Sequence, residues 1–207
     1  MIRRRHIPLA LTLFRFLLGP AFVVVYSSPR VGPLRLVAAM AIIAASIFTD
    51  WLDGYTARRF NAVSVAGKLL DPFADALFCM IVFVVLAGKY DVPTGQRLLP
   101  VWVVAVLIGR EALVTFLLRP LALAKRVVIA ARMLGKVKTG FQFGLMITVM
   151  VAAMSYEDMW IVFEGLNWLA RHLRVFGYLV VVFLSVTSFG FYCYDVAQAL
   201  KRPRATA

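Results

Sequence analysis

Six long apolar segments, separated by short polar or basic stretches, make up most of the chain. We expect them to cover residues 7–26, 35–59, 67–86, 101–118, 139–154 and 175–200. Such lengths are close to the ~20 residues that a helix needs to cross a hydrocarbon core about 30 Å thick. The short alternating segments of a membrane β-barrel are absent, which leaves helices as the way to cross. The sequence predicts an all-α integral membrane protein with six transmembrane helices in a single domain, residues 1–207.

Composition supports this prediction and adds an orientation. The hydrophobic content of 62% excludes an ordinary soluble globule. The net charge of +13 would suggest nucleic acid in a soluble protein, but the Lys and Arg residues gather between the apolar segments. There they favour contact with anionic lipids and set the topology, so we expect no nucleic-acid partner.

The Lys and Arg residues divide unevenly between the two sides of the membrane. The two tails and residues 58–68 and 119–138 hold 15 of them, whereas the three opposite connections hold six. We therefore expect a multi-pass protein of the cell membrane with both termini in the cytoplasm and a basic N-terminal segment at the membrane interface. Residues 121–138 are basic and amphipathic, which is typical of a helix lying on the cytoplasmic surface.

The first apolar segment carries Arg15 in its middle. The segment is too long for a signal peptide and lacks a small-residue cleavage site, so we expect a retained span. A cation at this depth faces either the interior of the bundle or, by snorkelling, a membrane interface. We expect Arg15 to face a polar site inside the bundle.

Residues 50–75 contain four of the ten acidic residues of the chain. In hydrocarbon, four uncompensated carboxylates would cost on the order of 10 kcal/mol. At 100° per residue, the second segment places Asp50 on one face with Gly54, Ala57 and Arg58, and Asp53 on its flank. On the third segment, Gly67, Asp71 and Asp75 are spaced i, i+4 and i+8 and share one face.

A short connection makes these two segments antiparallel neighbours, so their acidic faces can meet. Carboxylates without Cys or His suit hard divalent ions such as Mg²⁺ or Mn²⁺. Four carboxylates are enough for two ions about 3.5–4 Å apart, an arrangement that stabilises phosphoryl transfer. Arg58 and Lys68 add cations where a diphosphate would lie, and no phosphate-binding loop of ATPases is present.

The spacing Asp50-x₂-Asp53-Gly54-x₂-Ala57-Arg58-x₈-Gly67-x₃-Asp71-x₃-Asp75 matches the signature of the CDP-alcohol phosphotransferase family at every defined position. Eight fixed residues at fixed spacing make this resemblance specific. Members of that family resemble the topology expected here, with six spans and a site that faces the cytoplasm. A homodimer is implied by the resemblance alone.

Residues outside this signature resemble the phosphatidylglycerophosphate synthase branch. They are Ile7-Pro8-x₃-Thr12-x₂-Arg15-x₄-Pro20, Arg110-Glu111 with Leu118-Arg119, and Gly135-Lys136-x-Lys138-Thr139-x₂-Gln142. Two positions depart from that pattern: His6 stands where Asn usually precedes Ile-Pro, and Ala76 stands where Lys often follows the last Asp. Both positions lie outside the eight-residue signature, so they affect the assignment to this branch and not the expected chemistry.

The resemblance implies transfer of a phosphatidyl group from CDP-diacylglycerol to the 1-hydroxyl of sn-glycerol 3-phosphate, with release of CMP. It implies metal ligation by Asp50, Asp53, Asp71 and Asp75 and makes Asp75 also the base. The residues expected to contact CDP-diacylglycerol are Gly54, Ala57, Arg58, Ser64 and Gly67. The candidates for the acceptor phosphate, which needs cations, are Arg110, Arg119, Lys136 and Lys138.

One geometric problem concerns the two arginines of the fourth segment. Arg110 and Arg119 are nine residues apart, which places them on opposite sides of a straight helix. Both can reach one pocket only if Pro120 ends the helix or Arg119 reaches around it. Glu111 is expected to orient an arginine and not to bind metal.

Alternative functions stay open. The acceptor could be inositol phosphate, serine or phosphatidylglycerol, although the Arg110-Glu111 and Gly135–Thr139 segments favour glycerol 3-phosphate. A divalent-cation transporter would be expected to repeat its acidic motif, which occurs once here. A purely structural membrane protein would leave the cost of four buried carboxylates without an offset.

Overall fold

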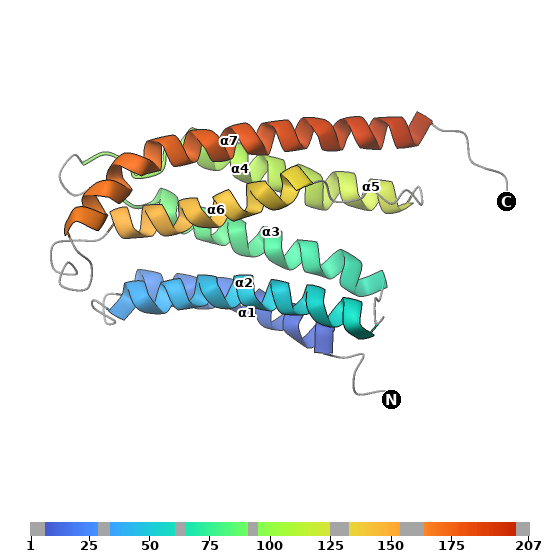
Figure 1. The fold of residues 1–207 in the computed structure, drawn as a ribbon, viewed down its shortest axis with the longest axis horizontal. Coiled ribbons are helices and arrows are strands. Elements are labelled where there is room, and N and C mark those ends of the chain that lie inside the picture. The colour runs from blue at the N-terminus through green and yellow to red at the C-terminus, as the bar shows by residue number, and fades with distance from the viewer. Residues whose placement is uncertain are drawn as a thin grey trace.

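The computed structural model describes residues 7–28, 34–60, 65–90, 95–124, 133–153 and 164–201, which are helical almost throughout (Figure 1). The elements are α1 (Ile7–Ser27), α2 (Leu34–Phe60), α3 (Val65–Ala87), α4 (Val101–Ala112), the π-helical segment η3 (Leu113–Leu118), α5 (Arg119–Ala124), α6 (Met133–Ala152) and α7 (Glu164–Lys201). Because α4, η3 and α5 follow without a break, the described residues form six helical rods. An isolated bridge between Tyr90 and Arg97 is the one β-type pairing among them.

Each predicted apolar segment falls on one of these rods, so the all-α, multi-pass prediction is confirmed. Four stretches are long and apolar enough to cross a membrane by length and composition: Leu34–Leu52, Leu70–Ala87, Val101–Ala122 and Trp168–Gln198. Two shorter apolar stretches, Thr12–Ser27 and Val137–Ala152, overlap the first and fifth predicted segments. The full count of six spans and the cytoplasmic position of the termini stay predictions.

Successive rods run in alternating directions and lie roughly side by side (Figure 1). α1 packs against α2 and α3, α6 packs against α7, and α4 contacts both α3 and α7. α3 therefore connects the N-terminal helices to the C-terminal ones. Its buried residues Phe78, Val82, Phe83 and Leu86 belong to the hydrophobic core that joins the two groups.

The outward surface of the bundle is apolar, as expected for helices that contact lipid. Only 11% of the apolar stretch of α7 is buried within the molecule, and Phe176 and Phe183 on it are exposed. Several polar side chains described below are buried inside the bundle instead, among them Arg15, Lys138 and Ser188. This inside-out pattern is that of a membrane protein whose polar residues mark a functional interior.

The fourth apolar segment was expected to end at residue 118, but the helix continues through Pro120 to Ala124. Proline lacks an N–H and clashes with the preceding turn of an α-helix. Here the preceding turn is π-helical, and the backbone N–H of Arg119 donates to the carbonyl of Val114, five residues back. Pro120 thus falls in the first turn of the next α-helical segment, where a proline is tolerated.

The surface helix predicted over residues 121–138 is also corrected. Residues 121–124 continue the fourth rod, and α6 begins at Met133, so its first two turns include Lys138. Lys138 is buried and donates to Glu111, so its charge does not lie on the membrane surface. Residues 125–132 and the basic N-terminal tail, residues 1–6, lie outside the described part of the chain. The sixth rod begins at Glu164, well before the predicted start at 175.

Candidate active site

Three of the four predicted aspartates gather around α1 in what we call the acidic cluster: Asp50, Asp71 and Asp75 with Thr12 and Arg15. Arg15 Nη1 lies 2.8 Å from Asp75 Oδ1, and its Nη2 lies 3.7 Å from Asp50 Oδ1. The Thr12 hydroxyl donates to Asp71 Oδ1 at 2.5 Å. The acidic residues of α2 and α3 therefore come together at Arg15 of α1, the helix that packs against both α2 and α3. The expectation that Arg15 faces a polar site is confirmed.

The acidic cluster has a closed side and an open side. The Arg15 side chain is completely buried, whereas the side chains of Asp50 and Asp75 are 61% and 44% exposed. The carboxylates can therefore be reached from outside the protein while their counter-ion cannot. Such an arrangement allows a soluble cation or a charged headgroup to approach Asp50 and Asp75 without displacing α1.

The donor set of the acidic cluster fits a hard divalent cation. Carboxylate oxygens are the ligands that Mg²⁺ and Mn²⁺ prefer, and two of these carboxylates already converge on one cationic group, the guanidinium of Arg15. Among the described side chains, no three His, Cys, Asp or Glu residues by themselves form a group able to hold a metal ion. The side chain of Asp53, the fourth predicted ligand, lies outside that described set, so the four-ligand site stays a prediction.

The predicted CDP-diacylglycerol contacts are only partly placed. Four of them lie on helical backbone whose side chains are not described: Gly54, Ala57 and Arg58 on α2, and Gly67 on α3. Ser64 lies outside the described residues. The helical backbone keeps Gly54, Ala57 and Arg58 on the helix face of Asp50, as the sequence predicts.

A second polar group, the basic cluster, consists of Arg110, Glu111, Lys138 and Ser188. Glu111 Oε2 accepts from Arg110 Nη1 at 2.7 Å and from Lys138 Nζ at 2.8 Å. Arg110 Nη2 also donates to the Ser188 hydroxyl at 3.1 Å. One carboxylate thus holds two cations from α4 and α6, as expected of a residue that orients an arginine, and α7 adds a neutral acceptor.

The basic cluster is mostly desolvated. The side chain of Lys138 is 4% exposed, that of Arg110 11% and that of Glu111 19%. Two cations against one carboxylate leave a formal excess of one positive charge in a region where burial is costly for unpaired ions. An anion such as a phosphate group would balance that excess. Lys136 lies in the first turn of α6, but its side chain is not described.

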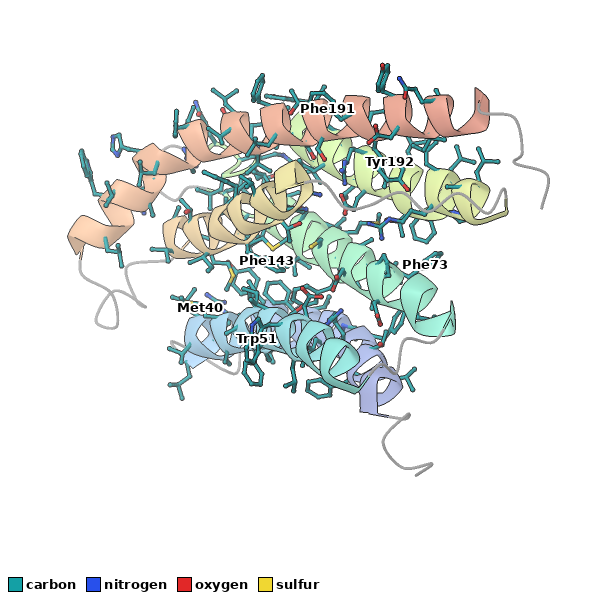
Figure 2. All side chains as sticks on the ribbon, turned by 45° about the vertical axis from the view of Figure 1, so that its right-hand side comes forward. Met40, Trp51, Phe73, Phe143, Phe191 and Tyr192 are labelled. Carbon is teal, nitrogen blue, oxygen red and sulfur yellow. The ribbon has the colours of Figure 1, made fainter. Side chains whose placement is uncertain are left out.

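Arg119 and Arg110 both reach the inner face of α7, despite the half-turn expected between them. Arg110 hydrogen-bonds Ser188, and Arg119 hydrogen-bonds the hydroxyl of Tyr192, one turn further along α7 (Figure 2 labels Tyr192). The reason is η3, which lies between the two arginines. π-Helical bonds join residues i and i+5, so each turn takes more residues and the phase of the helix changes.

α3 brings the acidic and basic clusters near each other. The buried Cys79, one turn after Asp75, lies near Asp75 and Arg15 of the acidic cluster and near Glu111 and Lys138 of the basic cluster. Arg119 interacts electrostatically with Asp75 as well. Phe73 of α3, labelled in Figure 2, makes an edge-to-face contact with Phe116 of η3, the ring centres 4.5 Å apart. A cation held by the open carboxylates and an anion held by the basic cluster would therefore lie on neighbouring parts of the same bundle.

Three contact residues were not predicted, namely Thr12, Ser188 and Tyr192, and Arg15 was expected to face a polar site but was not assigned a role in it. Thr12 and Arg15 had a visible signal, since they are polar, three residues apart and embedded in an apolar segment. Ser188 and Tyr192 had little, because Ser, Thr and Tyr are common in apolar helices and nothing local distinguishes these two. Their role depends on helix packing and could not be found from sequence.

Comparison with known proteins identifies one family and several relatives that share one name. The sequence model of the CDP-alcohol phosphatidyltransferase family matches residues 5–188. A protein of Bacillus subtilis (strain 168) named CDP-diacylglycerol–glycerol-3-phosphate 3-phosphatidyltransferase is 35% identical over 162 residues, 73% of this chain and 80% of the relative. Proteins with the same name are 37% identical over 143 residues in Yersinia enterocolitica and 39% identical over 138 residues in Salmonella paratyphi A. They cover 69% and 66% of this chain, and 75% and 72% of their own lengths.

Proposed function

Because this chain belongs to the CDP-alcohol phosphatidyltransferase family, we propose that it transfers the phosphatidyl group of CDP-diacylglycerol to sn-glycerol 3-phosphate, forming phosphatidylglycerophosphate and CMP. The observation that carries this proposal is the eight-residue signature within a family match over residues 5–188. The acceptor follows from the names of the relatives and from the buried basic cluster, which suits an acceptor that carries its own phosphate.

The acidic cluster is proposed to hold the diphosphate end of CDP-diacylglycerol through divalent cations. This family is generally dependent on divalent metals, and two Mg²⁺ or Mn²⁺ ions would neutralise the diphosphate and stabilise charge on the transferred phosphorus. The residues that would hold them are Asp50, Asp53, Asp71 and Asp75. Gly54, Ala57, Arg58, Ser64 and Gly67 are proposed to contact the cytidine diphosphate.

Asp75 is proposed as the base that takes the proton from the 1-hydroxyl of the acceptor. Its Oδ1 is held by Arg15, which fixes the direction of the carboxylate. A base must lie within hydrogen-bond reach of the proton that it removes, so a fixed direction favours the reaction. Attack of the hydroxyl oxygen on the β-phosphorus then forms the new phosphodiester bond while CMP leaves.

The acceptor phosphate is proposed to bind Arg110 and Lys138, with Arg119 and Lys136 as further cations. Arginine offers paired N–H donors that match phosphate geometry, and lysine adds a point charge. Arg119 interacts electrostatically with Asp75 and hydrogen-bonds Tyr192. These two contacts support a role for Arg119 beside an acceptor that bridges the two clusters. This grouping supports glycerol 3-phosphate over serine, which has no phosphate.

We further propose a site that faces the cytoplasm of the cell membrane, which would give access to soluble glycerol 3-phosphate. The distribution of Lys and Arg along the chain supports this orientation. Anionic lipids are proposed as partners of the Lys- and Arg-rich stretches between the apolar segments. A homodimer is proposed from the family resemblance alone.

The decisive experiment measures CMP release by the full-length protein in detergent micelles with CDP-diacylglycerol and either Mg²⁺ or Mn²⁺. Glycerol 3-phosphate, inositol phosphate, serine and phosphatidylglycerol are compared as acceptors. We expect release only with a divalent cation and only with glycerol 3-phosphate. Release with a different acceptor would keep the chemistry and change the substrate, whereas no release with any of them would reject the transferase.

A further inference from the structure

We infer that Arg15 is a built-in counter-ion of the acidic cluster: it stabilises the folded protein when no divalent cation is bound, and it weakens the binding of that cation. This inference rests on the proposed metal site and concerns a residue outside the family signature. Arg15 is therefore a positioning residue and not a metal ligand.

The position of Arg15 requires an electrostatic explanation. It lies in the middle of an apolar helix, its side chain is completely buried, and its guanidinium approaches carboxylates from two other helices, Asp75 on α3 and Asp50 on α2. A buried cation is tolerated only where opposite charges and hydrogen bonds compensate the lost hydration. The planar guanidinium can hold two carboxylates at once, which the point charge of a lysine does less well.

Thr12 shows that α1 orients the carboxylates as well as balancing their charge. Thr12 and Arg15 are one turn apart on α1, and their partners Asp71 and Asp75 are one turn apart on α3. Both contacts engage the Oδ1 atom of the aspartate. The packing of α1 against α2 and α3 thus sets the direction of the carboxylates before any ligand arrives (Figure 1).

A cation bound to the open side of Asp50 and Asp75 would be repelled by the guanidinium on their closed side. Removal of that positive charge has two opposite consequences. The carboxylates lose an orienting partner, which weakens metal binding, and they lose a competing charge, which strengthens it. We expect the loss of repulsion to be the larger effect. A divalent cation a few Å from the guanidinium is repelled strongly, because it carries two charges and the surroundings have a reduced dielectric constant. The loss of orientation costs less, because the aspartate side chains are short and have few conformations to restrict.

The test uses the full-length protein in detergent micelles, stripped of metal with a chelator and titrated with Mn²⁺ alone. Thermal unfolding reports stability, and the electron paramagnetic resonance signal of free Mn²⁺ reports binding. We expect Mn²⁺ to raise the Tm of the wild-type protein, as any ligand of the folded state does. Arg15→Gln should unfold at a lower temperature without Mn²⁺, gain more from Mn²⁺ than the wild type, and bind Mn²⁺ at least ~10-fold more tightly, equivalent to about 1.4 kcal/mol.

Two further variants separate charge from packing. Arg15→Lys keeps the charge, so its Mn²⁺ Kd should stay within about threefold of the wild type, less than about 0.7 kcal/mol. Thr12→Val is the matched control on the same helix, since it removes a contact with Asp71 without a change of charge. It should lower the Tm by a similar amount with and without Mn²⁺.

An equal loss of Tm in Arg15→Gln with and without Mn²⁺ would overturn the inference, as would tighter Mn²⁺ binding by Arg15→Lys. If Arg15→Gln folds only in the presence of Mn²⁺, the inference is supported in its strongest form. If Arg15→Gln folds neither with nor without Mn²⁺, the Mn²⁺ Kd of Arg15→Lys decides: an unchanged Kd supports the inference, and tighter binding rejects it. No effect of Mn²⁺ on the wild-type protein would instead reject the proposed metal site itself, which is a different failure.

Discussion

The acidic and basic clusters have the same design with opposite signs. The acidic cluster holds three carboxylates and one buried arginine, which contacts two of them, and in the basic cluster two cations share one carboxylate. Each therefore keeps an excess of one sign after internal pairing. A divalent cation would balance the negative excess of the acidic cluster, and a phosphate group would balance the positive excess of the basic cluster. Without these ligands, Arg15 and Glu111 offset part of the repulsion within their clusters.

The two clusters differ in exposure and in how the chain builds them. Asp50 and Asp75 are open to the outside, whereas Lys138 and Arg110 are nearly enclosed. An open site suits the headgroup of a large lipid that arrives from the bilayer, and an enclosed site suits a small soluble acceptor that must be selected. The comparison suggests that the acidic cluster sets the reaction and the basic cluster sets the acceptor.

The largest expected effect tests whether the acidic cluster carries the chemistry. Asp75→Asn should lower kcat by at least ~10³-fold, because it removes both a general base and a metal ligand. CMP release under saturating substrates measures it, with a size-exclusion profile to show that the variant folds. Asp195→Asn on α7, a carboxylate outside both clusters, is the matched control and should keep most activity. Near-wild-type turnover by Asp75→Asn would show that the base is elsewhere.

The next effect tests whether the basic cluster selects the acceptor. Arg110→Met should raise the KM for glycerol 3-phosphate by about 10- to 150-fold, the range expected for loss of a hydrogen bond between charged groups. The KM for CDP-diacylglycerol should change less than about threefold, or under 0.7 kcal/mol. Steady-state kinetics with each substrate varied in turn provides the measurement. Equal changes in both KM values would mean that the two clusters do not divide their tasks.

A smaller effect concerns the carboxylate that holds the two cations. Glu111→Gln should lower stability by about 2 kcal/mol, because it leaves Arg110 and Lys138 close together in a mostly desolvated region. The double variant Glu111→Gln/Lys138→Met should recover part of this loss, since the like-charge repulsion is gone. Denaturation of the four proteins of this cycle in detergent measures the coupling. Additive losses would show that Glu111 does not act through Lys138.

The smallest effect concerns the hydroxyl that α7 offers to Arg110. Ser188→Ala removes a single hydrogen bond, so we expect the KM for glycerol 3-phosphate to rise by about 3- to 10-fold. Thr187→Ala is the matched control, because that neighbouring hydroxyl bonds the α7 backbone at Phe183 and Leu184 instead. If both variants behave alike, α7 has no specific part in holding Arg110.

The helices and the acidic half of the site could be predicted from the amino-acid sequence alone. Apolar length predicts the rods because each must satisfy its backbone within one segment. The faces of Asp50, Asp71 and Asp75 could be predicted because α2 and α3 are consecutive and helical periodicity is local. The signature residues also identified the family, which the match over residues 5–188 confirms.

The arrangement of the cations, in contrast, depends on how distant helices pack. Arg110, Lys138 and Ser188 lie on α4, α6 and α7, up to 78 residues apart, and helical periodicity carries no information across such distances. The π-helical segment before Pro120 also changed the phase of the helix, so that Arg119 reaches α7 where a straight helix would not allow it. The charged residues of each cluster could therefore be found in the sequence. Which side chains they contact depends on the packing of helices that are far apart in the chain.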